Sequence, residues 1–303
     1  MNPPRLDWNP HRLQDQLQAI SPGWRVQAVA HTGSTNADLL EAARQGDLQP
    51  RVLVAEAQSA GRGRQGRQWH SAPGASLTFS MAMCLRPLHG WGSLSLVVGH
   101  ALAECLQPWP DGRAPAGQGP LMLKWPNDLW WYATPPVTPA DRAQGRKAAG
   151  VLIETLPLPA GTAAEGTRWV VIGVGLNIEP LALPAPGNGS DWPRLACVSD
   201  WHPGATATDC WHRVVPAVIE AVLEFQDRGA AHRVATLQAR DLLVGQPVAL
   251  TAGAVSQGQC VGIDADGALR VQAEGRVHRV VAGEVSVRPQ AGPSPGLPSP
   301  KPA

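Results

Sequence analysis

A loop in which three arginines alternate with three glycines, residues 61–67, gives the clearest chemical signal in the sequence. It follows a predicted strand and matches the pattern Gly-x-Gly-x-x-Gly, which is typical of dinucleotide-binding folds. Those folds also need a helix that opens at the third glycine and an acidic residue about 20 positions later. Here the loop runs into Pro73-Gly74, and Arg86-Pro87 stands where the acidic residue would belong. The pattern therefore does not indicate a dinucleotide site.

The same loop suits the binding of an anion. Glycine lets the backbone approach an anion closely, and a guanidinium group grips a carboxylate or a phosphate with a pair of hydrogen bonds. Two alternatives remain, a solvated basic loop without a ligand and a segment that binds nucleic acid. The net charge of +1 disfavours nucleic-acid binding, because the sequence has no further basic region to support it.

Residues 124–129, Lys-Trp-Pro-Asn-Asp-Leu, place polar groups at the end of a short apolar strand. The turn presents Asn127 and Asp128. A carboxylate beside an amide and near a lysine suits Mg²⁺ and phosphate chemistry. An ordinary Pro-Asn-Asp turn has the same composition, so the motif alone does not decide between the two interpretations.

Lysine is rare in this chain, which has 22 arginines and only three lysines. Lys147 precedes a strand of small and branched residues, in which Gly150 leaves room for something to lie against the backbone. An ammonium and a planar guanidinium are not interchangeable, so lysine is expected where arginine would not fit. A surface lysine in an ion pair is the alternative. Asn177 stands in a further apolar strand and needs a hydrogen-bond partner, for which a ligand is reasonable.

Together these segments offer anion-binding arginines, isolated lysines, a carboxylate able to hold a metal, and amides on strands. The sequence has no nucleophile paired with a base, no Gly-x-Ser-x-Gly and no lysine in a phosphate-binding loop of the Walker type. This combination favours activation of an acid at phosphorus without a covalent enzyme intermediate. It does not name the acid.

Predicted strands and helices alternate over the first 240 residues and would position these segments. The first two dozen residues are weakly patterned, and stretches rich in Pro and Gly predict surface insertions at 108–120 and 133–146 and a long loop at 183–210. Strands are expected at residues 25–31, 51–58, 75–83, 121–123, 151–154 and 169–178, and helices at 35–43, 94–106, 214–225 and 231–240.

The residue pattern changes after residue 241, where short valine-rich runs alternate with Gly and Asp turns. This predicts a small antiparallel barrel or sandwich, followed by a disordered Pro-rich tail at 290–303. The five cysteines are irregularly spaced, and the sequence has neither a signal-peptide pattern nor an apolar run of about 20 residues. We expect free thiols, a cytoplasmic location and no membrane contact.

Five segments resemble, in their order along the chain, the motifs of biotin protein ligases. They are Gly-Ser-Thr-Asn at 33–36, the loop at 61–69, Lys-Trp-Pro-Asn-Asp at 124–128, Lys-Ala-Ala-Gly at 147–150 and Gly-Val-Gly-Leu-Asn at 173–177. The resemblance implies an α+β fold with a mixed sheet like that of class II synthetase cores. Residues 1–240 would form this biotin- and ATP-binding catalytic domain, and residues 241–289 a small SH3-like barrel.

The resemblance also implies roles for the matching residues. Lys147, Arg62 and Asp128 would be catalytic. Lys147 would lie between the biotin carboxylate and the α-phosphate, and Asp128 would bind Mg²⁺ or orient the acceptor lysine. The residues implied to contact biotin are Ser34, Thr35, Asn36, Gln58, Gly61, Arg62, Gly63, Arg64, Lys147, Gly150 and Leu152. Those implied to contact the nucleotide are Arg64, Arg67, Trp69, Lys124, Asn127 and Asn177.

The implied reaction uses ATP and Mg²⁺ to form biotinyl-5′-adenylate and then transfers biotin to a lysine of a biotin carboxyl carrier protein. A lipoate or octanoate ligase or transferase of the same fold is the alternative. Some members of the family also have an N-terminal DNA-binding winged helix. The N-terminal segment here is too short for one, so DNA is not an expected partner.

We predict that removing residues 290–303 leaves the activity and the melting temperature nearly unchanged. The tail has too few apolar side chains to offset the entropy that ordering it would cost. Thermal melts and activity assays of the truncated and full-length chains test this. A melting temperature several degrees lower in the truncated chain would contradict it.

Overall fold

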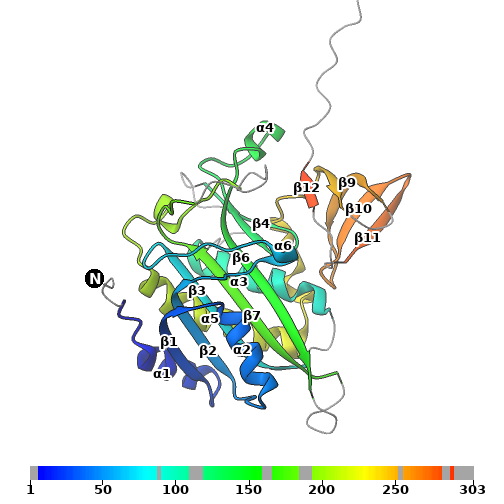
Figure 1. Cartoon of the computed structure of the whole chain (residues 1–303). Coiled ribbons are helices and arrows are strands. Elements are labelled where there is room, and N and C mark those ends of the chain that lie inside the picture. Colours follow the sequence, from blue (N-terminus) through cyan, green and yellow to red (C-terminus); the bar gives the residue numbers. More distant parts are fainter. Residues whose placement is uncertain are drawn as a thin grey trace, which may run out of the picture.

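The structure is a computed structural model that describes residues 6–86, 90–108, 119–158, 166–183, 193–251, 255–281 and 287–289. These residues form a large mixed sheet with helices and a small antiparallel sheet (Figure 1). The predicted tail at 290–303 lies outside the described residues, as do most of the predicted insertion at 108–120 and residues 184–192 of the predicted loop.

Seven strands form the large sheet, in the order β1-β2-β3-β7-β6-β5-β4. β1 runs parallel to β2, and the other neighbouring strands pair antiparallel. The strands are β1 (Arg25–Thr32), β2 (Arg51–Gln58), β3 (Ser76–Leu85), β4 (Leu121–Lys124), β5 (Asp128–Trp131), β6 (Arg146–Pro157) and β7 (Arg168–Asn177).

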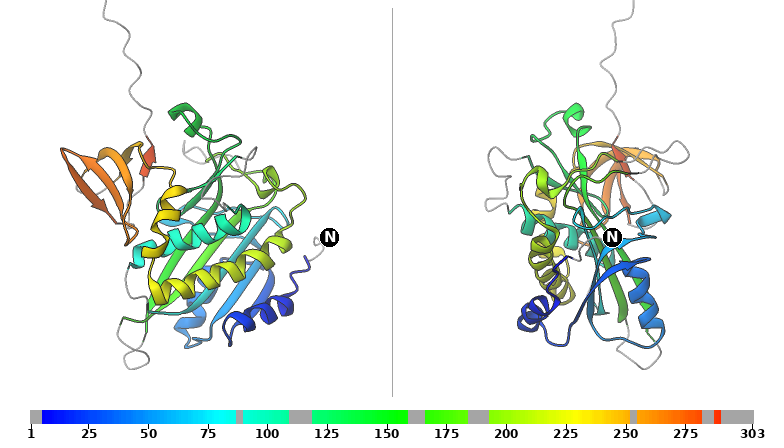
Figure 2. Two further views of the ribbon diagram at one scale, coloured as in Figure 1. Left: turned by 180° about the vertical axis from the view of Figure 1, so that it is seen from behind. Right: turned by 60° about the vertical axis from the view of Figure 1, so that its left-hand side comes forward.

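Helices cover the two faces of this sheet unequally (Figure 2). α1 (Pro10–Ile20), α3 (Leu94–Leu106) and α5 (Ala207–Arg228) lie on one face, over the main apolar core. On the other face α2 (Thr35–Arg44) packs against β2, β3 and β7 over a smaller apolar cluster. The loop between β2 and β3 crosses the rest of that face (Figure 1). This second face is where the chemically interesting segments meet.

Two short helices, α4 (Pro139–Arg142) and α6 (Val234–Ala239), complete the first part of the chain. The small sheet follows, with the strand order β11-β10-β9-β8-β12 and antiparallel pairing throughout. Its strands are β8 (Pro247–Leu250), β9 (Gln257–Ile263), β10 (Leu269–Ala273), β11 (Arg276–Val280) and β12 (Val287–Pro289).

The turn between β9 and β10 joins the small sheet to the large one. Asp264 shapes this turn, because its Oδ1 accepts the backbone N–H groups of Asp266 and Ala268 at 3.0 and 2.9 Å. Trp125 is buried, and its Nε1 donates to the carbonyl oxygen of Gly267 at 3.0 Å. The small sheet therefore contacts the motif at 124–128 through a buried indole.

The α+β class expected from the sequence is confirmed, but the N-terminal segment is more ordered than its weak pattern suggested. Asn9 caps α1, since its side chain accepts the backbone N–H of Arg12, and Pro10 stands at the start of the helix. Leu13 and Leu17 lie one turn apart and are fully buried. Two apolar positions suffice for a helix that packs on a large core, although they make little periodicity in the sequence.

Two further elements are longer than predicted. α5 begins at Ala207 rather than at residue 214, because Thr206 caps it by accepting the N–H of Asp209 at 3.1 Å. Its first turn, residues 207–210, therefore belongs to what the sequence suggested was a loop. β6 extends from Arg146 to Pro157 and includes Lys147, which the sequence placed just before the strand.

We predict that Gly267→Ala lowers the free energy of unfolding by about 1–3 kcal/mol more than Gly275→Ala does. Both glycines have positive φ, +82° and +76°, so the backbone strain of the two alanines should be similar. A Cβ on Gly267 would lie 2.4 Å from Ser93 Cα, whereas no described atom lies within 4 Å of one on Gly275. Urea denaturation measures the difference, and equal losses would argue against the close packing of the β9–β10 turn on Ser93.

Candidate active site

Small side chains line the sheet face under the β2–β3 loop. Residues that face each other across antiparallel strands project to the same side. The register pairs Gly150 with Gly175 and Gly175 with Thr78, which makes a row of small residues across β6, β7 and β3. Gly173 and Ser80 are paired in the next row. Larger residues at these positions would fill the space above the sheet.

The indole of Trp69 lies in this space, against two of the glycines. A Cβ on Gly175 would lie 2.2 Å from Trp69 Cε2, and a Cβ on Gly150 would lie 3.3 Å from Trp69 Cζ3. The loop is folded back at its base, where Trp69 N donates to Gly61 O at 2.9 Å. A Cβ on Gly61 would lie 2.4 Å from the carbonyl oxygen of Trp69. The glycines at these positions are thus needed because ring and backbone approach closely.

Lys147 and Asp128 form an ion pair at the edge of the same surface, with 2.6 Å between Nζ and Oδ1. Both side chains are largely buried, at 18% and 19% exposed. The lysine Nζ also lies 5.7 Å from the centroid of the Trp69 ring. The Asn177 amide donates to the carbonyl oxygens of Lys147 and Ala196 at 3.0 and 3.1 Å. The backbone that bears this lysine is therefore fixed from the neighbouring strand.

Asn127 connects the arginine loop to β6. Its Nδ2 donates to the carbonyl oxygen of Val151 at 2.7 Å, and its backbone oxygen accepts the N–H of Val151 at 2.9 Å. Its Oδ1 lies 3.5 Å from Arg64 Nη1. Burial lowers the pKa of the Arg64 guanidinium below its ordinary value, which the negative charge of Asp128 opposes and the positive charge of Arg67 reinforces. A partly desolvated cation of this kind interacts strongly with an anion.

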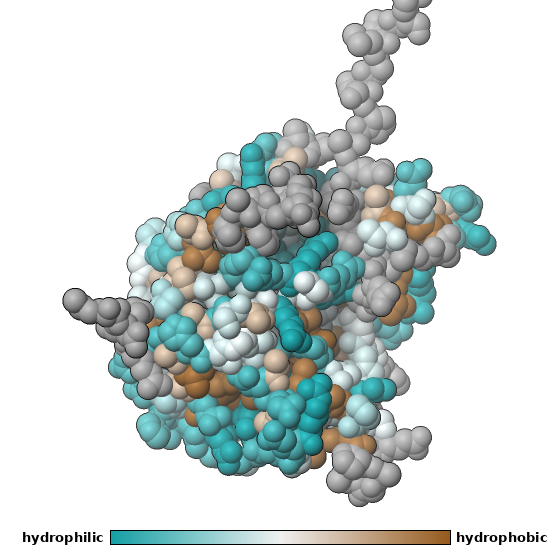
Figure 3. Space-filling model, in the orientation of Figure 1, coloured by the Kyte–Doolittle hydropathy of each residue, from teal (hydrophilic) through white to brown (hydrophobic). Residues whose placement is uncertain are grey.

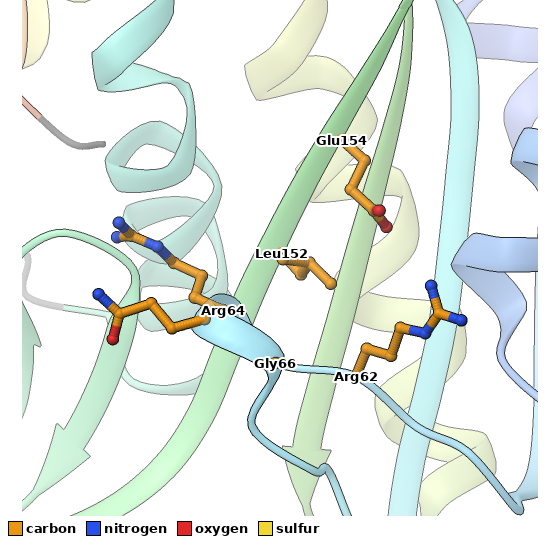
Figure 4. A pocket seen from close by; sticks show the side chains of 7 residues that line it. Arg62, Arg64, Gly66, Leu152 and Glu154 are labelled. Carbon is orange, nitrogen blue, oxygen red and sulfur yellow. The ribbon is translucent and has the colours of Figure 1, made fainter. Parts of the chain in front are cut away.

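A pocket of about 790 Å³ lies between the loop and β6. Leu152 and Glu154 project from β6, and the side chains of Arg62 and Arg64 extend from the loop toward opposite sides of it (Figure 4). Hydrophilic side chains gather across the middle of this face of the molecule (Figure 3). The pocket can therefore hold a ligand with a charged end and a less polar body.

The remaining predicted site residues fall into two groups. Thr35, Asn36 and Gln58 lie together and are joined by hydrogen bonds that include Ser80 and Glu154. Sequence reasoning gave no role to Ser80 or Glu154. For Ser80 the available signal was the alternation of small polar and large apolar residues along β3.

The second group of predicted site residues, Ser34 and Lys124, lies on elements near the site. Ser34 caps α2, and its Oγ accepts the N–H of Ala37. Lys124 faces Asp128 across the β4–β5 hairpin, with its Nζ 4.5 Å from the centroid of the Trp130 ring. The structure thus brings the five sequence motifs to one face of the sheet.

Comparison with known proteins agrees with this arrangement. The family model of the Biotin/lipoate A/B protein ligase family matches residues 29–177, and that of the Biotin protein ligase C terminal domain matches residues 243–288. The bifunctional ligase/repressor BirA of Escherichia coli is 32% identical over 277 residues, which are 90% of this chain and 77% of the relative. The chain belongs to the biotin protein ligase family.

A second ligase of this family, the biotin–[acetyl-CoA-carboxylase] ligase of Mycobacterium tuberculosis, is 40% identical over 170 residues. The match spans about half of each chain, 55% of this one and 54% of the relative. A solved structure of the biotin protein ligase from Aquifex aeolicus, in complex with biotin and ATP, superposes with a TM-score of 0.64 at 22% identity. It covers 88% of this chain and 99% of that chain, which confirms the biotin protein ligase fold.

We predict that Gly175→Ala destabilises the protein by about 1–3 kcal/mol and that this cost largely disappears in a Trp69→Ala background. The added methyl group would collide with the indole, and removing the indole removes the collision. Urea denaturation of the wild type, both single variants and the double variant measures the coupling. Additive losses would mean that Trp69 does not rest on this glycine.

Proposed function

We propose that this protein activates biotin with ATP and transfers it to a lysine of a biotin carboxyl carrier protein. The main support from the site is the Lys147–Asp128 pair, which stands beside the arginine loop at the edge of a surface cleared of large side chains. A lysine in this position suits a reaction in which negative charge grows on a phosphate. The family membership of the chain supports the choice of biotin as the acid.

In the first proposed step a carboxylate oxygen of biotin attacks the α-phosphorus of ATP. The bond from that phosphorus to the bridging oxygen breaks, and biotinyl-5′-adenylate and pyrophosphate form. Lys147 Nζ would donate to the biotin carboxylate and to the α-phosphate, while Arg64 and Arg67 would hold phosphate oxygens. Fixed cations matter most here, because they stabilise charge that develops in the transition state.

In the second step the neutral amine of the carrier lysine attacks the acyl carbon of the mixed anhydride, the bond from that carbon to the phosphate oxygen breaks, AMP leaves, and the amine releases a proton to solvent. Asp128 would orient this amine. The pair in the structure shows that its carboxylate can engage a lysine ammonium, since it already accepts from Lys147. Trp69 and Asn127 would contact the nucleotide, and the loop at 61–67 would cover the adenylate and keep water from it.

Magnesium fits this site as an ion that arrives with the nucleotide. Among the described residues no group of three or more His, Cys, Asp or Glu side chains is placed to hold a metal. Mg²⁺ keeps several water ligands and binds through one or two carboxylates together with substrate phosphates. Asp128 would be its protein ligand, and the ion would neutralise phosphate charge.

The proposed partner is a biotin carboxyl carrier protein or domain. Within the part of the chain that the structure describes, no helix is long and apolar enough to cross a membrane. A cytoplasmic location and the absence of DNA binding stay predictions. Measuring DNA binding of this protein beside that of a relative named as a ligase/repressor tests the second prediction.

Mass spectrometry tests the proposed function. The protein is incubated with a carrier domain, ATP, Mg²⁺ and biotin, and in parallel with lipoate or octanoate. The expected result is one biotin on one lysine, with dependence on ATP. A carrier modified only by lipoate or octanoate would establish the alternative, and an unmodified carrier would contradict the proposal.

We predict that Lys147→Arg abolishes most adenylate formation while the protein stays folded. A compact ammonium can donate to a carboxylate and a phosphate at once, whereas the wider guanidinium would displace one of them. The loss should be on the order of a hundredfold in rate. Biotin-dependent exchange of pyrophosphate into ATP measures it, with circular dichroism as the folding control. Wild-type exchange in the folded variant would show that Lys147 is not central to the reaction.

A further inference from the structure

A relay of polar side chains, buried at its centre, crosses the sheet under the arginine loop. It begins at Glu154 on β6, whose Oε2 accepts from Asn36 Nδ2 at 2.8 Å. Asn36 Oδ1 accepts from Ser80 Oγ at 2.5 Å, and Ser80 Oγ lies 2.6 Å from Thr35 Oγ1. Thr35 also reaches Gln58, whose Oε1 accepts the backbone N–H of Thr35 at 2.7 Å. The relay thus connects three strands and the start of α2.

The glutamate sets the direction of the hydrogen bonds that join Asn36, Ser80 and Thr35. A carboxylate only accepts, so Asn36 must turn its NH₂ group to Glu154 and its oxygen to Ser80. The single hydroxyl hydrogen of Ser80 is then used on Asn36. The short contact between Ser80 and Thr35 needs a hydrogen, which Thr35 must supply.

The hydroxyl of Thr35 is left without a second hydrogen to donate. Its contact with Gln58 Oε1 is longer, at 3.2 Å, and would compete for the same hydrogen. Thr35 Oγ1 can therefore serve a further partner only as an acceptor. Gln58 can serve a ligand only as a donor. Its oxygen already accepts from Thr35 N, and its NH₂ group lies on the side of Gly61.

The fold makes room for this relay. Thr35, Asn36 and Ser80 are at most 4% exposed, so their hydrogen bonds are shielded from water. A Cβ on Gly173 would lie 2.3 Å from Asn36 Oδ1, so a larger residue there would displace the amide. Leu152 O also lies 3.4 Å from Asn36 Nδ2. Leu152 O lies at the limit of hydrogen-bond distance and is therefore a weaker acceptor for the Asn36 NH₂ group than Glu154 Oε2 at 2.8 Å.

We propose that Glu154 is a positioning residue that, through Asn36 and Ser80, makes Thr35 an obligatory acceptor beside the amide donor of Gln58. Thr35 and Gln58 together select a ligand group in which an N–H, which donates to Thr35, stands next to a carbonyl oxygen, which accepts from Gln58. The inference rests on the proposed function, since the ureido ring of biotin is such a group. The dithiolane ring of lipoate and the alkyl chain of octanoate have no N–H, so the relay discriminates against both.

Glu154→Gln tests the proposal, because an amide at this position can donate as well as accept and no longer fixes the direction. We expect the dissociation constant for biotin, measured by calorimetry, to rise about tenfold, which corresponds to the loss of about one oriented hydrogen bond. The dissociation constant for ATP should stay within about twofold. In the steady state KM for biotin should rise while kcat at saturating biotin is retained.

A double variant restores the direction without restoring the glutamate. With Asn36→Asp and Glu154→Gln together, the carboxylate at position 36 accepts from both the new amide at position 154 and the Ser80 hydroxyl, so Thr35 again donates to Ser80. Biotin affinity should return to within about threefold of the wild type. Glu41→Gln is the matched control, since this glutamate is exposed on α2 and pairs with Arg44. It should leave biotin affinity unchanged.

Biotin analogues methylated on each ureido nitrogen complete the test. They should bind the wild type more weakly, and the analogue that lacks the N–H facing Thr35 should lose nothing further in Glu154→Gln. Equal losses for biotin and both analogues, or no recovery in the double variant, would overturn the proposal in favour of a purely structural role. If Glu154→Gln fails to fold, Ser80→Ala serves instead, because it also frees the Thr35 hydrogen.

Failure of this inference is distinguishable from failure of the proposed function. A wild-type protein that does not bind biotin would refute the function. A wild type that binds biotin and a folded Glu154→Gln variant that binds it equally well would refute only the relay.

Discussion

The antiparallel register of β3, β7 and β6 is the constraint on which the site depends. Along β3, Leu77, Phe79 and Met81 face the main helices and are fully or almost fully buried, while Ser76, Thr78 and Ser80 face the other way. Glycines at facing positions of β7 and β6 continue the small residues across the sheet. One alternation in sequence therefore builds the core on one side and clears the binding surface on the other.

The groups around this surface differ in how firmly they are held. The backbone of Lys147 is held by hydrogen bonds with the backbone of Arg194 and Ala196, and Asn127 is held by two hydrogen bonds with the backbone of Val151. The arginines at 62, 64 and 67 stand on a loop whose glycines allow many conformations. A sheet-borne lysine beneath a glycine-rich loop suits the proposed reaction, which must admit a large nucleotide and then retain a reactive adenylate.

Much of this arrangement could be predicted from the sequence, because the motifs are local. The scarcity of lysine singled out Lys147, and the room expected at Gly150 is filled by Trp69 and the Lys147 side chain. The relay could not be predicted, because Glu154 and Asn36 lie far apart in sequence and meet only through the register. The α1 helix was not predicted because two leucines give little periodicity, and its burial depends on a core formed by later residues.

The bond from Trp125 to Gly267 has an evolutionary consequence. Recombination between related genes can exchange whole modules. The small C-terminal sheet resembles such a module, because its five described strands pair only with one another. Yet an exchanged module would need a glycine where its β9–β10 turn packs against Ser93. It would also need a backbone carbonyl oxygen within hydrogen-bond distance of the buried Trp125 indole. Lineages should therefore inherit this turn and the tryptophan together, even where the rest of the module drifts freely.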